Sequence, residues 1–178
     1  MGNYNAILDQ KVTQDASAEP VNLNVVKEYM KVDYQEEDLL ISSLIKTARK
    51  LLESKYDVGI IEKTLRVVLN NSCGGRDLPG SPITEIVSVA TRAGAITDFE
   101  IIGEFHRFVE KPVCDYLVIT YKSGYSMDQV PEAFKTAIKA QALWMFERRG
   151  DQDISSKVCP AAAAIMAPYK RNSLGFFL

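Results

Sequence analysis

The chain has 178 residues, of which 47% are hydrophobic and 25% are charged, and its formal net charge is -2 at pH 7. This length and composition predict one globular domain with its own core, and the interleaved charges argue against a nucleic-acid backbone as the main partner. The three cysteines, Cys73, Cys114 and Cys159, are odd in number and far apart, which favours free thiols over a disulfide framework.

Residues 1–20 mix small, polar and isolated apolar residues without a helical or strand period, and they predict an extended arm. The first residues lack the basic and apolar regions of a secretory signal, and no stretch is long enough to span a bilayer. We therefore expect neither export by a standard signal nor insertion into a membrane. Tyr4, Ile7, Leu8 and Val12 belong either to a floppy terminus or to a segment that orders against a neighbouring subunit.

Two helices are predicted next. Residues 22–32 place apolar side chains on one helical face, with Asn22 or Asn24 as the cap. Asp33 and Glu36 have the spacing of a capping box, and an apolar stripe then predicts a long helix over residues 35–57. Arg49 is expected on the solvent side of that helix, together with Lys46, Lys50 and Glu53.

Beyond residue 60 the hydrophobic period changes towards two and β-branched residues become frequent, which indicates strands. We predict strands over residues 65–69, 83–91 and 116–121, and either a strand pair or one bent strand around Gly103. The short connections favour a small, mainly antiparallel sheet.

A third helix is predicted from Pro131, because proline is tolerated in the first helical turn. Its apolar face is broad enough for two stripes, one for the subunit's own bundle and one for a neighbour. The first stripe contains Phe134, Ile138 and Met145, and the second contains Ala133, Ala140 and Trp144. A fourth helix is predicted from Pro160. The apolar tail that follows contains Leu174, Phe176 and Phe177, which either fold back onto the core or contact a partner.

Together these elements predict an α+β fold: a mainly helical bundle of about four helices, with a small, mostly antiparallel β-sheet inserted between the second and third helices. We expect an N-terminal arm over residues 1–20, the main domain over 21–171 and a C-terminal apolar tail over 172–178.

The residues that carry catalysis or bind metals are sparse. His106 is the only histidine and lies in a strand-like segment, and no nucleophile signature surrounds a cysteine. The isolated cysteines do not have zinc-ligand spacing, and Gly74-Gly75 lacks the Lys-Ser/Thr of a phosphate loop. We therefore expect no catalytic residue, no cofactor and no metal, and we predict that the chain is not an enzyme.

Three segments resemble a known family, the head-to-tail connector (adaptor) proteins of tailed bacteriophages. Residues 21–53, VNLNVVKEYMKVDYQEEDLLISSLIKTARKLLE, are similar to the opening helix pair of that family. Residues 121–150, YKSGYSMDQVPEAFKTAIKAQALWMFERRG, resemble its Gly-Tyr, Val-Pro and Arg block, and residues 159–171, CPAAAAIMAPYKR, resemble its closing helix. With LPGSPITEIVSV in the sheet, the resemblance covers residues 21–171 and leaves both tails outside it.

The resemblance implies a structural virion protein at the head-tail junction, assembled in the host cytoplasm. It implies a homo-oligomeric ring, a dodecamer, that binds the portal protein and a downstream connector, stopper or tail protein while DNA passes through its channel without sequence-specific binding. Candidate portal or inter-subunit contacts are Leu174, Phe176, Phe177, Tyr4, Ile7, Leu8, Ala133, Ala140 and Trp144. The main alternative is a small helical nucleic-acid-binding or regulatory protein, which predicts a basic face, and a thiol enzyme ranks last.

Overall fold

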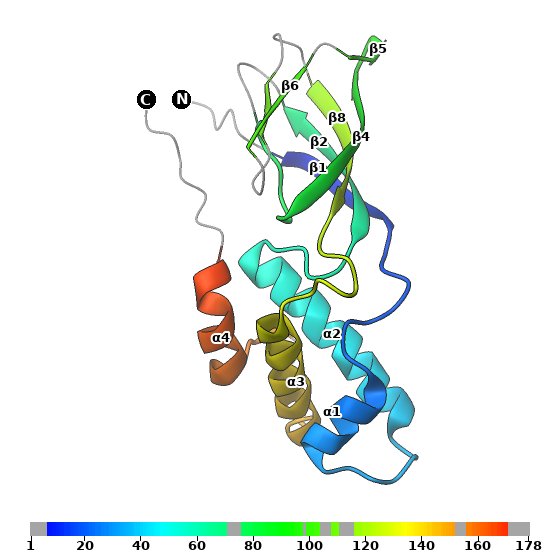
Figure 1. Cartoon of the computed structure of the whole chain (residues 1–178), viewed down its shortest axis with the longest axis vertical. Helices are drawn as coiled ribbons and strands as arrows, with labels where there is room; N and C mark the ends of the chain where they lie inside the picture. The colour runs from blue at the N-terminus through cyan, green and yellow to red at the C-terminus, as the bar shows by residue number, and fades with distance from the viewer. Residues whose placement is uncertain are drawn as a thin grey trace. The chain divides into compact units, whose positions relative to one another are not determined.

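The computed structural model describes residues 7–70, 76–97, 99–103, 108–110, 116–151 and 156–170. The chain forms two units (Figure 1). The first, called the sheet unit here, comprises Met1–Ser17 and Ile61–Met127, and the second, the helical unit, comprises Ala18–Ile60 and Asp128–Leu178. Within the described residues, no helix combines the length and the apolar character that crossing a bilayer requires.

The sheet unit is built on a five-stranded antiparallel sheet with the strand order β1-β2-β8-β4-β5. Its strands are β1 (Ile7–Gln14), β2 (Lys63–Asn70), β8 (Tyr116–Ser123), β4 (Ile83–Thr91) and β5 (Gly94–Ala95). A second antiparallel sheet has the order β3-β7-β6, with β3 (Arg76–Asp77), β7 (Phe108–Glu110) and β6 (Glu100–Ile102). The segment around Gly103 is thus a strand pair, one of the two arrangements that the sequence allowed.

The core of the sheet unit lies on one face of the five-stranded sheet. Along the central strand β8, half-buried and buried side chains alternate, as expected for a sheet with one covered face. The Tyr121 hydroxyl lies in this core and donates a hydrogen bond of 2.9 Å to the carbonyl oxygen of Pro79, which satisfies the buried phenol. The core residues are Leu65, Val67, Leu69, Leu78, Ile83, Val89, Leu117, Ile119 and Tyr121.

A close backbone crossing joins the start of β2 to the end of β8. The Glu62 N–H donates to the carbonyl oxygen of Tyr125 at 2.9 Å, and Ile61 forms a bridge with Tyr125. Gly124 has a φ of +108°, and a Cβ atom at that position would lie 2.2 Å from the Ile61 carbonyl oxygen. Only glycine combines this backbone conformation with so close an approach.

The helical unit contains α1 (Leu23–Met30), α2 (Asp38–Tyr56), α3 (Glu132–Glu147) and α4 (Pro160–Met166), followed by the short 3-10 helix η2 (Ala167–Tyr169). Helix α3 packs against both α2 and α4, and α1 packs against α2. The unit therefore has its own core, formed by buried residues that include Val26, Ile41, Ile45, Ala48, Leu52, Phe134, Ala137, Ile138, Ala142, Met145, Ala162 and Met166.

The predicted caps agree with the structure only in part. Asn22 caps α1, because its side-chain oxygen accepts a hydrogen bond of 2.8 Å from the N–H of Asn24. The predicted capping box at Asp33 and Glu36 is wrong. Helix α2 begins at Asp38 after the N-cap residue Glu37, which makes no side-chain cap hydrogen bond.

A buried ion network corrects the predicted solvent side of α2. Arg49 is 1% exposed and Glu53 is 7% exposed. The Arg49 guanidinium donates to both carboxylate oxygens of Glu19, at 2.7 and 3.0 Å, and to Glu53 at 3.1 Å. Glu53 also accepts a hydrogen bond of 3.0 Å from the N–H of Ile60. The network thereby ties α2 to the segments before α1 and after its own end.

The predicted architecture, a mainly helical bundle with a small sheet inserted between the second and third helices, is wrong. The edge strand β1 precedes α1 in the chain, so the sheet is not an insertion between α2 and α3, and it belongs to a unit comparable in extent to the helical one. The sequence of β1 shows no alternation of apolar and polar residues, because all eight of its residues are exposed. An edge strand with two uncovered faces needs no alternation of apolar and polar residues.

Candidate interaction surfaces

The described cysteine has a structural role. Cys159 is buried, and its sulfur accepts a hydrogen bond of 3.3 Å from the N–H of Ala162 at the start of α4. Its own N–H donates to the buried Gln141 side chain at 2.8 Å, and Gln141 also donates to the Lys157 carbonyl oxygen at 2.9 Å. This bridge fixes the segment that enters α4 against α3. His106, Cys73 and Cys114 lie outside the described residues. That neither cysteine forms a catalytic pair with His106 therefore stays a prediction.

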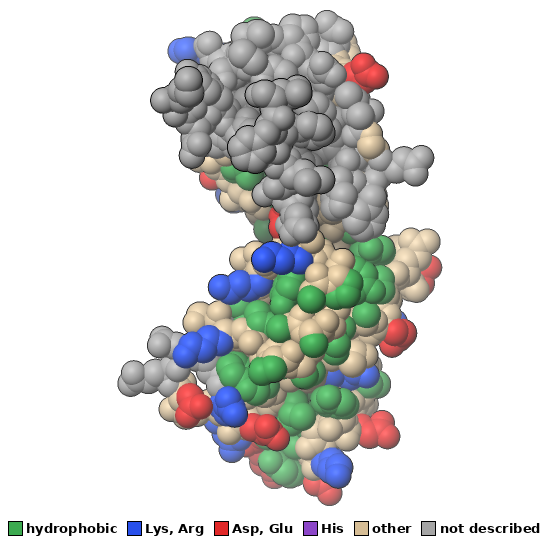
Figure 2. All heavy atoms as spheres, turned by 90° about the vertical axis from the view of Figure 1, so that its left-hand side faces the viewer, with side chains coloured by type: hydrophobic (Ala, Val, Ile, Leu, Met, Phe, Trp, Pro, Cys, Tyr) green, Lys and Arg blue, Asp and Glu red, His purple; other side chains and the backbone are tan. Residues whose placement is uncertain are grey.

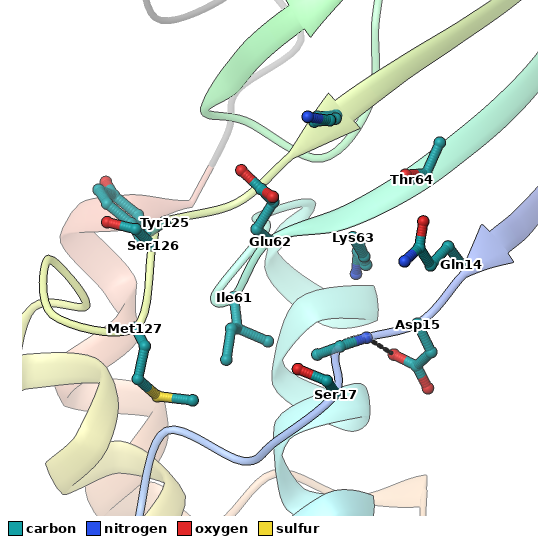
Figure 3. Close-up of a pocket in the computed structure, with 12 residues that line it drawn as sticks. Gln14, Asp15, Ser17, Ile61, Glu62, Lys63, Thr64, Tyr125, Ser126 and Met127 are labelled. Carbon is teal, nitrogen blue, oxygen red and sulfur yellow. Dashed lines mark hydrogen bonds between the residues drawn. The ribbon is translucent and has the colours of Figure 1, made fainter.

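A polar pocket opens in the sheet unit where β1 and β8 end and β2 begins (Figure 3), with a volume of about 400 Å³. In this pocket the Asp15 carboxylate accepts a hydrogen bond of 2.9 Å from the N–H of Ala16. Lys122 forms an ion pair of 2.9 Å with Glu85. The lining residues are Gln14, Asp15, Ala16, Ser17, Ile61, Glu62, Lys63, Thr64, Lys122, Tyr125, Ser126 and Met127.

Charged, amide and hydroxyl side chains form most of the lining of this pocket. The hydrogen bond with Glu85, and secondly the charge of that carboxylate, raise the pKa of Lys122, which keeps the amine in its non-nucleophilic ammonium form. The pocket residues include no histidine or cysteine. Among the residues that the structure describes, no three metal-ligating side chains converge. The pocket therefore has the properties of a polar surface cleft.

The outer edge of β1 is one candidate interaction surface. Ile7, Leu8 and Val12 are 43%, 58% and 45% exposed, which is unusual for large apolar side chains on a strand. Ile7 lies opposite Leu69, and Val12 lies opposite Leu65, both of which are buried core residues of β2. The apolar face of the sheet thus continues onto β1, where it is exposed to solvent. Two predicted contact residues, Ile7 and Leu8, are placed on this strand, and their role as contacts stays a prediction.

A second apolar surface lies on α1 and the start of α2. Leu39 is 88% exposed and Leu40 is 38% exposed, although the sequence pattern placed Leu40 on the buried stripe. Val25, Tyr29 and Tyr34 are also exposed. Sequence reasoning missed this surface, because Leu39 and Leu40 continue the apolar pattern of a helix whose buried face begins one residue later, at Ile41.

The face of the helical unit that includes α4 is the third apolar surface, and hydrophobic side chains gather there in Figure 2. Every exposed residue of α4 and η2 is apolar. These residues are Pro160, Ala161, Ala164, Ala167, Pro168 and Tyr169. The surface is therefore apolar, and apart from Tyr169 it is formed by small side chains.

The predicted neighbour-facing stripe of α3 is largely covered within the helical unit. Ala140 is 9% exposed, and Ala133 and Trp144 are half-buried. The Arg148 guanidinium lies 5.2 Å from the centre of the Trp144 ring and covers part of it. Tyr4, Leu174, Phe176 and Phe177 lie outside the described residues, so their predicted contacts are not placed.

Solved structures with the same fold include chains of gene transfer agent (GTA) particles, each 15% identical to this chain. A chain from the neck of an empty GTA particle, computed with C6 symmetry, has a TM-score of 0.77 over 94% of this chain and 98% of that chain. A chain from the virion of a native GTA particle has a TM-score of 0.76 over 93% and 97%. A chain from the neck of a native GTA particle, computed with C12 symmetry, has a TM-score of 0.69 over 93% and 98%.

No family model matches the chain, and no curated protein matches it. At 15% identity, the structural likeness establishes the fold. This chain therefore shares, along nearly its whole length, the fold of chains found in GTA particles.

Proposed function

We propose that this chain is a structural protein of the neck of a phage-like particle, where it acts as the head-to-tail connector. The observation that carries the proposal is the fold likeness to a chain of a GTA neck, which covers 94% of this chain and 98% of that one. Because one fold can host many functions, this likeness supports the role by analogy, and the assembly experiment below tests it.

The sequence resemblance supports the same function on different grounds. It rests on three segments in a fixed order, whereas the fold likeness rests on the path of the backbone. In this proposal the chain forms a homo-oligomeric ring, a dodecamer, in the virion. One face of the ring binds the portal protein, the other binds a downstream connector, stopper or tail protein, and the chain has no enzymatic activity.

The exposed apolar surfaces support a role in assembly. Apolar side chains such as Leu39 and Leu8, which are 88% and 58% exposed, gain stability when a partner removes them from water. A ring uses heterologous interfaces, in which one patch meets a different patch on the next copy. The described surfaces on β1, on α1 and α2, and on α4 offer such dissimilar patches.

The two tails are assigned to contacts between proteins. We assign residues 1–20 to an arm whose strand β1 joins the sheet, residues 21–171 to the connector domain and residues 172–178 to a portal-binding tail. Leu174, Phe176 and Phe177 would supply apolar contacts in that tail, and Tyr4 would do so in the arm. DNA passes through the ring without sequence-specific binding, because a chain with a net charge of -2 does not offer a strongly basic surface to phosphates.

The test is assembly with the portal protein of the same particle. Light scattering after size-exclusion chromatography, followed by electron microscopy, should find a ring of this chain, alone or on the portal. Deleting residues 172–178 should weaken portal binding and leave the circular dichroism spectrum unchanged, whereas the control variants Asn172→Ala and Ser173→Ala should bind as the wild type does.

Two results would contradict the proposal. Failure of the full chain to bind portal under any assembly condition would remove the connector role. Tight, salt-sensitive binding to DNA fragments would instead favour the nucleic-acid-binding alternative.

A further inference from the structure

We propose that copies of this chain join through their five-stranded sheets, with the β1 edge of one copy pairing with the open edge of β4 in the next. The inference rests on the self-association in the proposed function, and it names the two surfaces that carry it.

The sheet has an open edge at each end. Strand β1 is the outermost strand at one end, and no described strand pairs with its outer side. At the other end, β5 pairs only with Ala90 and Thr91 of β4, and the Ile96 N–H donates to the Val89 carbonyl oxygen. No described strand covers residues 85–88 of β4 on that side. Strand edges of this kind present backbone donors and acceptors that can pair with another strand.

The exposed large apolar side chains of the described sheet residues lie on β1 and on β4, the two strands with an open edge. On β1 they are Ile7, Leu8 and Val12, and on β4 the 51% exposed Val87. The inner strands β2 and β8 have no exposed large apolar side chain among their described residues. Strand edges that remain solvent-exposed usually carry charges or prolines, which prevent pairing. The edges here carry charges as well, Asp9 and Lys11 on β1 and Glu85 on β4. The exposed large apolar residues found only on these strands nevertheless favour coverage by a further strand.

The directions of the strands fit a head-to-tail contact. Each neighbour in the series β1-β2-β8-β4 is antiparallel to the next, so β1 and β4 run in opposite directions. Suppose that a second copy lies beside the first in the same orientation. The β4 strand of the second copy then runs antiparallel to the β1 strand of the first. Antiparallel pairing is slightly more stable per residue than parallel pairing. Because the two edges differ, the contact is heterologous and forms a ring when the rotation closes.

The charges on the two edges are complementary at one pair. Lys11 is exposed near the middle of β1, and Glu85 of β4 is 56% exposed although it pairs with Lys122. An antiparallel register that places Lys11 opposite Glu85 brings opposite charges side by side, and it places Asp9 opposite the apolar Val87, so that no like charges meet directly. The occupant of each edge is therefore a second copy of this chain.

The test uses one charge substitution on each edge, Val12→Lys and Val87→Asp, and the second places a like charge opposite Asp9 in the proposed register. Wild-type chain and both variants are compared by size-exclusion chromatography with light scattering, alone and with portal protein. Wild type should form a ring, and each variant should run as a single chain. An equimolar mixture of the two variants should form dimers but no ring, because only the intact β4 edge of one variant and the intact β1 edge of the other can pair.

Three results would overturn the inference. If Val87→Asp still dimerises by itself, β1 pairs with β1. If both edge variants keep the wild-type ring while Leu39→Lys disrupts it, the helical unit closes the ring, and the proposed function stands without this inference. If wild type remains a single chain both alone and with portal, the inference and the proposed function fail together.

Cross-linking gives an answer even if an edge variant does not fold. The double variant Lys11→Cys and Glu85→Cys is prepared with Cys73 and Cys114 replaced by serine, leaving the buried Cys159. Oxidation should produce a ladder of covalent oligomers on a non-reducing gel, and each single-cysteine variant should give dimers at most. If the double variant also stops at dimers or remains a single chain, β1 does not pair with β4.

Discussion

Replacing Arg49 by methionine should destabilise the helical unit by about 3 kcal/mol. The guanidinium is 1% exposed and bonds to both oxygens of Glu19 and to Glu53. Methionine fills the space of the aliphatic stem but leaves the two carboxylates without their cation. Removing one partner of a buried ion pair typically costs about 3–5 kcal/mol. The lower end applies here, because the Glu19 side chain is 24% exposed and can rehydrate, and Glu53 keeps the N–H of Ile60.

The measurement is urea denaturation followed by the fluorescence of Trp144. This residue is the only tryptophan in the chain and lies on α3, so its signal reports the helical unit. The matched control is Lys46→Met, the same substitution at an exposed position of α2, which should change the free energy of unfolding by less than about 0.5 kcal/mol. Adding Glu53→Gln to Arg49→Met should recover part of the loss, because the amide oxygen still accepts from Ile60 and the buried carboxylate charge that faced Arg49 is gone.

A loss below about 1 kcal/mol for Arg49→Met would refute this reasoning, because it would equal the cost of an exposed ion pair. Equal losses for Arg49→Met and Lys46→Met would refute it as well, since the burial of the guanidinium would then have no energetic consequence.

Three further predictions concern the two units separately. Gly124→Ala should lower the thermal midpoint or prevent folding, because the new Cβ would lie 2.2 Å from a backbone oxygen, whereas Gly150→Ala, whose Cβ meets no atom within 4 Å, should leave the midpoint unchanged. Gln141→Leu should cost about 1–3 kcal/mol in urea denaturation, because two backbone groups before α4 lose their partner, and unchanged stability would count against the bridge. Glu85→Gln should lower the pKa of Lys122 towards its ordinary value in an NMR titration. The pKa of Lys122 is higher in the folded chain than in the unfolded chain, so its pair with Glu85 stabilises the fold fully at a pH below the ordinary lysine pKa. This stabilisation is lost as the pH rises through the pKa that Lys122 has in the folded chain. The stability difference between wild type and Glu85→Gln should therefore disappear at high pH.

The elements that bury one face could be predicted from the sequence. Strand β4 has the predicted bounds, Ile83–Thr91, and β8 contains the whole predicted strand. Helix α2 follows the predicted apolar stripe closely, from Asp38 to Tyr56. In β8 and α2 the side chains repeat with the period of the element, because one side faces a core and the other faces solvent.

The elements that depend on contacts distant in sequence could not be predicted this way. Strand β1 pairs with β2, about fifty residues later in the chain, and its exposed side chains follow no period. Arg49 was assigned to solvent because it is charged, although it follows Ile45 by four residues on the buried stripe of α2. That spacing was the available signal, and the acceptor that makes burial tolerable, Glu19, comes from a segment outside the helix.

The candidate interaction surfaces also depend on contacts between segments distant in sequence, which the sequence pattern does not reveal. Sequence reasoning named Ile7 and Leu8 through their apolar character, but it did not place them on the edge of a sheet. It also assigned a neighbour-facing role to the Ala133, Ala140 and Trp144 stripe; Ala140 is buried and the other two are half-buried, and the role stays a prediction. Which part of a broad apolar helix is covered depends on how many helices pack around it, and a single helical pattern does not carry that information.

The position of β1 in the chain has a consequence for the order of folding. β1 is synthesised before α1 and α2, yet its partner β2 follows both helices. During synthesis β1 cannot pair with β2 until the helix pair has emerged. Pairing then requires the closure of a long loop, whose entropic cost delays distant contacts relative to local ones. β1 is therefore ordered later than the helices that follow it in the chain, and in hydrogen exchange β1 should exchange before the inner strands β2 and β8.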